Sequence, residues 1–157
     1  MNLSPNFSFS EFCSSQVAAR RGLDNKMPEE FIPSAILLCE RVLEPARAAL
    51  GPILVTSGYR SKKVNTAVGG AWGSQHQIGE AADIIPLAEG VSVFALFEWI
   101  YKNCEFDQLI FEYGVWAHVS YAPALRKAVL VASYVPGERR ASYAPVTPEH
   151  LAALGIT

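Results

Sequence analysis

The chain has 157 residues, half of them hydrophobic, and a formal net charge of −2. This length suits one domain, and the hydrophobic share is large enough to form a substantial buried core. The near-neutral charge provides no basic stripe for nucleic acid and no polycationic surface for anionic lipid. We therefore expect no nucleic-acid partner and look for function in a local site.

The ends and the cysteines of the chain indicate its compartment. Met1–Asn6 lacks a basic segment followed by an apolar one, and no apolar run approaches the length of a membrane span. We expect synthesis in the cytoplasm without a signal peptide, no membrane insertion, and a monomer. Cys13, Cys39 and Cys104 are odd in number and widely spaced, which predicts reduced core thiols rather than a disulfide framework.

Helix signals dominate the first third of the chain. Ser8 and Glu11 fit a capping box, which predicts a short helix that begins at Phe9. Apolar residues recur at helical spacing over Pro33–Leu50, and this range should be the main core helix. Pro45 lies inside it and removes one backbone hydrogen bond, so we expect a kink or a break in the turn before it.

Strand-like runs and turns alternate through the middle of the chain. Ile53–Ser57 predicts a buried strand, Gly58–Arg60 a bend, and a short helix follows from Ser61. Ala81–Pro86 predicts a second strand. Ser92–Asn103 predicts a helix that is capped by its first residue.

The last third predicts a hairpin, one more strand and a terminal helix. Phe106–Tyr113 and Trp116–Tyr121 are alternating runs around a turn, which is typical of a β-hairpin. Val129–Tyr134 predicts a further strand at the sheet edge. Thr147 is a favourable N-cap for a small helix over Pro148–Leu154.

These elements predict an α+β fold in which helices pack on a small antiparallel sheet. We expect a single domain over residues 1–157. Its core should run from about residue 7 to 135, and residues 136–157 should form a C-terminal extension.

The densest chemical pattern is Ser74–Ile84, which places His76 and Asp83 close together in the chain. A catalytic zinc ion takes three protein ligands and keeps one open position, so this pair provides two of them and the third must be distant in sequence. His118 lies in a strand-like run that can fix an imidazole rigidly. His150 lies in the predicted terminal helix, where we expect it to face solvent. Two imidazoles and a carboxylate suit zinc better than magnesium or an iron–sulfur cluster.

The pattern Ser-x-His-x-x-Gly-x-Ala-x-Asp, followed downstream by Trp-x-His-Val-Ser, resembles the zinc D-Ala-D-Ala peptidase family. That family includes D,D-carboxypeptidases, D,D-dipeptidases and phage L-Ala-D-Glu endopeptidases, and Hedgehog signalling domains have a related fold. The resemblance runs from about Phe9 to about Tyr121. It implies one bound Zn²⁺ with three ligands: His76, Asp83 and His118.

The same resemblance implies roles for other side chains. Arg60, within Ser57–Ser61, matches the residue that polarises or clamps the substrate. Several members place the catalytic carboxylate three residues before the last histidine, but that position is Val115 here. The compact phage-type branch, which this chain resembles most, instead has a glutamate on the preceding strand, and this matches Glu112. Neighbouring side chains are candidates for substrate hydrogen bonds: Ser74, Gln75 and Tyr59.

Strand parity decides whether Glu112 can act as the general base. With a two-residue hairpin loop, Glu112 would point away from His118, and Asp107 would share the histidine's face instead. With the three-residue loop Tyr113–Val115, Glu112 and His118 share one face. We predict the three-residue loop because the phage-type resemblance places a glutamate here and because Phe111 suits the buried side of the sheet.

Taken together, the resemblance and these residues predict a zinc-dependent peptidoglycan peptidase that cleaves a bond in the stem peptide or cross-link. The motif region shows no clear second cation for a terminal carboxylate, so we favour an L-Ala-D-Glu endopeptidase over a D-Ala-D-Ala carboxypeptidase. The missing signal peptide fits a phage endolysin that acts on the periplasmic wall of its host. A non-catalytic, zinc-bearing wall-binding module is the alternative from another class, and Arg60 together with an available carboxylate argues against it.

Overall fold

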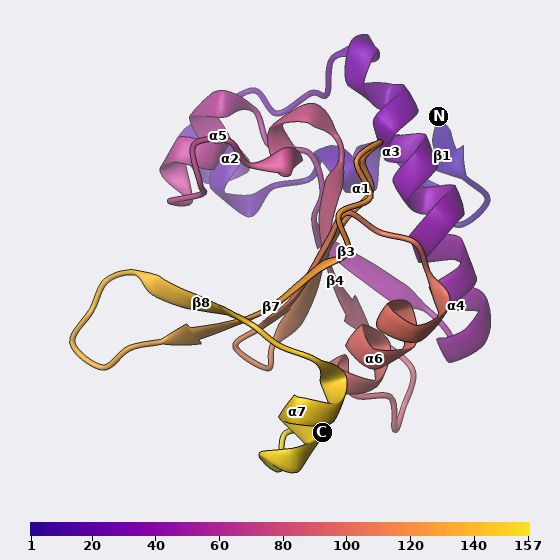
Figure 1. Cartoon of the computed structure of the whole chain (residues 1–157). Helices are drawn as coiled ribbons and strands as arrows, with labels where there is room; N and C mark the ends of the chain where they lie inside the picture. Colours follow the sequence, from indigo (N-terminus) through magenta and orange to yellow (C-terminus); the bar gives the residue numbers. More distant parts are fainter.

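The computed structural model describes residues 1–157 and contains seven α-helices and eight strands (Figure 1). The helices are α1 (Phe9–Cys13), α2 (Gln16–Arg21), α3 (Ile32–Leu38), α4 (Glu44–Leu50), α5 (Lys62–Ala67), α6 (Val93–Asn103) and α7 (Pro148–Ala153). The strands are β1 (Asn2–Ser4), β2 (Phe7–Ser8), β3 (Ile53–Ser57), β4 (Ala81–Pro86), β5 (Gln108–Glu112), β6 (Trp116–Ser120), β7 (Ala128–Tyr134) and β8 (Ala141–Pro145). No helix is long and apolar enough to cross a bilayer.

A six-stranded sheet in the order β3-β4-β6-β5-β7-β8 organises the molecule, and β1 and β2 form a separate small antiparallel pair. Figure 1 shows α3, α4 and α6 on one side of the large sheet and α2 and α5 on the other. The α+β fold class is confirmed. Five strand pairs in the two sheets are antiparallel, but β5 and β7 run parallel, so the large sheet is mixed.

The sheet extends one strand further than the sequence predicted. Val129–Tyr134 was expected at the sheet edge, and this is wrong because Ala141–Pro145 pairs with it as β8 and takes the edge. Four of the five β8 residues are exposed, so the strand carries no alternation of buried and exposed positions that would distinguish it from a loop. Figure 1 shows β7 and β8 projecting together from the body of the protein as a hairpin.

The predicted interruption of the long helix before Pro45 is confirmed. A π-helical turn over Cys39–Leu43 separates α3 from α4, and the Glu44 N–H donates to the carbonyl of Cys39, five residues back. Proline has no N–H to donate, and its ring conflicts with the carbonyl four residues earlier. The wider π turn removes this conflict without ending the helix.

The core lies mainly between the sheet and the helices α3, α4 and α6. Phe111 of β5 is buried there, with its ring centroid 5.4 Å from that of Phe97 and 6.1 Å from that of Phe94, both on α6. Because successive side chains of a strand point to opposite faces, this burial directs Ile110 and Glu112 to the other face of the sheet.

The predicted three-residue loop of the β5–β6 hairpin is confirmed. Ile110 stands opposite His118 and Glu112 opposite Trp116, which leaves Tyr113–Val115 as the loop. Tyr113 and Gly114 both have left-handed backbone angles, with φ of 57° and 70°. Glu112 and His118 therefore share one face of the sheet.

The C-terminal helix gives a test of the packing. Leu151 of α7 is 1% exposed and belongs to the core, whereas Leu154, just after the helix, is 66% exposed. Leu151→Ala should lower the free energy of unfolding by about 2–5 kcal/mol because it leaves a cavity. Leu154→Ala should change it by less than about 0.5 kcal/mol. Denaturant unfolding measures both, and equal effects would show that α7 does not dock on the core.

Candidate metal centre

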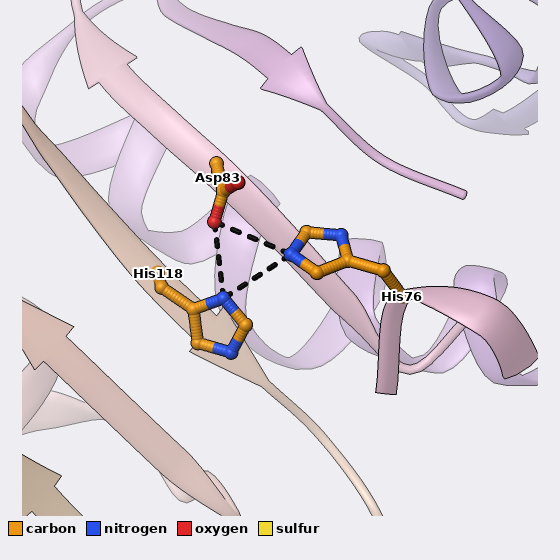
Figure 2. Close-up of side chains that lie close together, drawn as sticks. All are labelled: His76, Asp83 and His118. Carbon is orange, nitrogen blue, oxygen red and sulfur yellow. Dashed lines mark hydrogen bonds and ion pairs between the residues drawn. The ribbon is translucent and has the colours of Figure 1, made fainter. Parts of the chain in front are cut away.

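Three polar side chains from separate parts of the chain converge on one face of the sheet (Figure 2). Asp83 of β4 and His118 of β6 are directly opposed in the strand register, so their side chains leave the same face. His76 comes from the short 3₁₀ turn Gln75–Ile78, which precedes β4. Ser74 caps this turn, since its Oγ accepts a hydrogen bond from the His76 N–H.

The three facing ligand atoms form a compact triangle. His76 Nε2 lies 3.2 Å from His118 Nδ1 and 3.3 Å from Asp83 Oδ1, and the last two atoms are 3.0 Å apart. Tetrahedral zinc with bonds of about 2.0–2.1 Å holds its ligand atoms about 3.3–3.4 Å apart. The triangle and its two-imidazole, one-carboxylate chemistry therefore fit a zinc ion, with one coordination position left for water or substrate.

His76 is fixed in the orientation that a metal ligand needs. Its Nδ1 lies 2.6 Å from the carbonyl oxygen of Gly58 and donates to it, which leaves Nε2 with a free lone pair toward Asp83 and His118. Burial lowers the pKa of His76 although Asp83 favours the charged form, so the ring is neutral. Position 58 requires glycine, because a Cβ there would meet the Phe12 carbonyl oxygen at 2.7 Å.

Asp83 bridges the imidazoles and Arg60. Its Oδ1 faces the two histidines, and its Oδ2 accepts a hydrogen bond from Arg60 Nη2 at 2.8 Å. Burial alone would raise the pKa of Asp83, but the facing histidines hold it well below its usual range. Arg60 Nε also donates to Ser57 Oγ at 2.9 Å, so two of its groups are already engaged in holding the site.

Glu112 lines the cavity beside this triangle, on the same face of the sheet as His118. Its Oε1 lies 4.0 Å from His118 Nδ1, and the residue is buried. Burial and the nearby charge of Asp83 raise the pKa of Glu112 to about 7, against the effect of His118 and Arg60. A group with such a pKa can both accept and release a proton near neutrality.

Asp107, the other carboxylate considered for the face of His118, does not lie there. Its carboxylate is engaged by Arg126 and by Gln75, with its Oδ2 2.7 Å from Arg126 Nη2. The structure therefore brings Glu112 to the ligands and leaves Asp107 as a structural anion.

A cavity of about 690 Å³ opens over the ligands and contains most of the predicted site residues. Ser74 and Gln75 line it, although Gln75 Nε2 already donates to Asp107 and Glu80. Tyr59 does not reach the cavity. Its ring is buried in the core and stacks on Phe31 at a centroid distance of 6.3 Å, because the backbone at this position directs it away from the ligands.

The sequence did not predict the residues that form the far wall of the cavity. This wall includes side chains from the turn before β7 and from the β7–β8 hairpin: Arg126, Leu130, Tyr134 and Tyr143. Leu130 and Tyr134 share the face of Glu112 because β7 runs beside β5 with Glu112 opposite Ala132. Alternation along β7 could have indicated this face only if the parallel pairing had been known. Arg126 follows a loop and carries no such signal.

A buried His-Asp-His triangle beside a glutamate and under a cavity has the donor set and the space of a mononuclear metallohydrolase centre. The family model described as Peptidase M15 matches residues 5–120, and the chain belongs to that family. It is accordingly a metallopeptidase with zinc as its cofactor, and the family implies a peptidoglycan substrate. No curated protein matches the chain.

The histidines provide a matched test of the metal centre. His118→Ala should reduce bound zinc from one ion per chain to a small fraction of that, because it removes one of three ligands. His150→Ala should leave the stoichiometry at one, because His150 is exposed on α7, as predicted. Elemental analysis after dialysis measures both. Zinc should also raise the melting temperature of the wild type but not of His118→Ala, since a ligand that binds the folded state stabilises it. Stoichiometric zinc in His118→Ala would contradict the ligand assignment.

Proposed function

We propose that this chain is a peptidoglycan endopeptidase that cleaves the L-Ala-D-Glu bond of the stem peptide and acts as a phage endolysin on the periplasmic wall of its host. The observation that carries this proposal is the position of Glu112, on the same sheet face as the zinc ligands and 4.0 Å from His118. The compact phage-type branch that the chain resembles has a glutamate on this strand, which Glu112 matches.

The proposed division of labour follows from the geometry. His76, Asp83 and His118 hold the metal, and the chemistry that a bound zinc ion supplies is Lewis-acid activation of the attacking water and of the scissile carbonyl. Glu112 takes the proton of the attacking water on a carboxylate oxygen and passes it to the leaving amine. Its burial keeps the group close to the reacting atoms and poised between its two protonation states.

Arg60 has a double task in this proposal. Through Nη2 it neutralises and orients Asp83, and it also lines the cavity. Its Nη1 makes no hydrogen bond within the protein and is available to the carbonyl oxygen as negative charge develops there. Ser74 and the side-chain oxygen Oε1 of Gln75 remain candidates for hydrogen bonds to the peptide backbone of the substrate.

The layout of the cavity supports cleavage within a chain rather than at its end. Along β5, the cavity-facing positions are Gln108, Ile110 and Glu112, and His118 stands opposite the middle one. Lining residues continue past both ends of this row, to Arg126 at one end and to Tyr134 at the other. An endopeptidase needs such room on both sides of the scissile bond.

One observation favours a D-Ala-D-Ala carboxypeptidase as the second candidate. Arg126 lines the cavity and supplies the second cation that the motif region lacks. A terminal carboxylate is an appropriate partner for it.

Mass analysis of muropeptides distinguishes these candidates. Purified peptidoglycan treated with the zinc-loaded protein should release stem peptides with a new D-Glu amino terminus, whereas a carboxypeptidase would remove single D-Ala residues. Activity should disappear on chelation and return with zinc. If the zinc-loaded protein binds the wall and releases no fragment, a non-catalytic wall-binding module replaces the peptidase. Lysis of host cells on expression with a holin tests the endolysin role separately.

The general base has a sharp test. Glu112→Gln should lower kcat by about 10²–10⁴-fold, the usual contribution of a positioned acid–base group. Zinc stoichiometry should stay at one, because Glu112 is not among the three ligands. Glu105→Gln is the matched control, since Glu105 is exposed and pairs with Lys127 away from the cavity. A Glu112→Gln variant with normal kcat would transfer the role to another group.

Kinetics at saturating zinc separate the two tasks of Arg60. Arg60→Lys should lower kcat more than it raises KM, because an ammonium cannot hold Asp83 and reach the carbonyl oxygen together. If Arg60→Lys kept the wild-type kcat at saturating zinc, Arg60 would act only by orienting Asp83. A rise in KM alone would assign it to ground-state binding.

A further inference from the structure

Arg126 is a cavity residue that the proposed chemistry does not use. It lies after residue 120, where the family match ends, in the turn that leads into β7. Its side chain is 55% exposed and lines the same cavity as the zinc ligands. A cation in that position needs a partner on the substrate or a structural reason to be there.

The Nε–Nη2 edge of the Arg126 guanidinium is held by the buried carboxylate of Asp107. Nε lies 3.0 Å from Asp107 Oδ1 and Nη2 lies 2.7 Å from Oδ2, while the backbone N–H of Arg126 donates to Oδ1 at 3.0 Å. Asp107 is 1% exposed, and its Oδ2 also accepts from Gln75 Nε2 at 2.9 Å. Gln75 adjoins His76, so one hydrogen-bonded chain connects the guanidinium to the metal motif.

The backbone around Arg126 is held in an unusual conformation. Leu125 and Lys127, on either side, have φ of 40° and 51°, although neither is glycine. Such angles cost energy for residues with a side chain and persist only where the surrounding structure imposes them. The turn thus brings the Arg126 backbone N–H to Asp107, and the pairing of Nε and Nη2 with Asp107 orients the side chain.

One edge of the guanidinium remains for a ligand. A guanidinium has five N–H groups in a plane and can form two forked pairs with carboxylates. The Nε–Nη2 edge is occupied by Asp107. Nη1 and the outer hydrogen of Nη2 have no partner in the protein, and together they form the second fork.

The position of Arg126 sets the distance to the reacting bond. Arg126 pairs with Asp107, which directly precedes Gln108 at one end of the cavity-facing row of β5, and Glu112 lies at the other end. Gln108 is two residues from Ile110, which stands opposite His118, and this corresponds to about 7 Å along a strand. An extended peptide covers that length in about two residues.

We infer that Arg126 is a specificity-determining residue that binds a free carboxylate of the substrate one or two residues from the scissile bond, with Asp107 as its positioning residue. This inference rests on the proposed function, because it assumes a peptide substrate in the cavity. Two carboxylates of stem peptides have this chemistry: the α-carboxylate of the γ-linked D-Glu, and the terminal carboxylate of D-Ala.

Two matched pairs of synthetic peptides distinguish these sources. The first pair is acyl-L-Ala-γ-D-Glu-L-Lys amide with the D-Glu α-carboxylate either free or amidated. The second is acyl-L-Lys-D-Ala-D-Ala with its end either free or amidated. Binding to the zinc-loaded Glu112→Gln protein is measured by calorimetry, and cleavage by the wild type is measured as kcat and KM. In one pair, the free acid should bind about tenfold or more tightly than its amide, as expected for a charge-assisted forked pair.

Variants at Arg126 test whether this residue makes the distinction. Arg126→Gln should reduce the ratio of acid affinity to amide affinity to about one, because it removes the cation that binds the acid. Arg126→Lys should give an intermediate ratio, because an ammonium lacks the fork. Lys127→Gln is the matched control, since Lys127 adjoins Arg126 but pairs with the exposed Glu105 and does not line the cavity; it should keep the wild-type ratio.

A second variant guards against misfolding. Arg126→Gln leaves Asp107 buried without its cation, whereas Asp107→Asn combined with Arg126→Gln removes both charges and should retain zinc and a ratio of about one. Three results would overturn the inference. They are equal affinity for acid and amide in both pairs when Arg126 is present, absence of binding, and an unchanged ratio of acid to amide affinity in Arg126→Gln. A carboxylate preference in binding without cleavage of either pair would support the inference and contradict the proposed function. Cleavage without any preference for the free carboxylate would support the proposed function and contradict the inference.

Discussion

The pairing register of β4, β6 and β5 is the constraint on which the rest of the site depends. It places Asp83 opposite His118 and His118 opposite Ile110 across three neighbouring strands. A slip of one residue would send these side chains to the other face. That slip is prevented by burial on the opposite side, where Phe111 packs against α6. Hydrophobic packing on one face thus fixes the chemistry on the other.

The site concentrates charge in a buried place, and its members compensate one another. Arg60 pairs with Oδ2 of Asp83, and the two imidazoles lie against Oδ1 of the same carboxylate. Removal of one partner from such a group leaves an uncompensated buried charge, which usually costs several kcal/mol. The same closeness of Asp83, His76 and His118 makes a bound cation favourable, so metal binding and folding are thermodynamically coupled.

Local signals in the sequence predicted most of the helices and the three side chains that cluster as a possible metal site, His76, Asp83 and His118, because caps and motif spacing act over a few residues. The position of Glu112 was also predictable, since the burial of Phe111 fixes the parity of β5. The parallel pairing of β5 with β7 was not, because it joins segments across a crossover and leaves no periodic mark. Tyr59 was misjudged for a related reason: adjacency to Arg60 in sequence does not determine on which side of a bend a ring is buried.

The cavity is built from two parts with different physical requirements. The zinc ligands and Glu112 lie within residues 5–120, where strand register must hold atoms to within fractions of an ångström. The opposite wall comes from the turn before β7 and from the β7–β8 hairpin, which line the cavity but supply none of the three clustered side chains His76, Asp83 and His118. Leu151 anchors the end of this segment in the core. In the proposed function, side chains of the wall, Arg126 among them, determine which peptide enters while the geometry of the metal centre stays fixed.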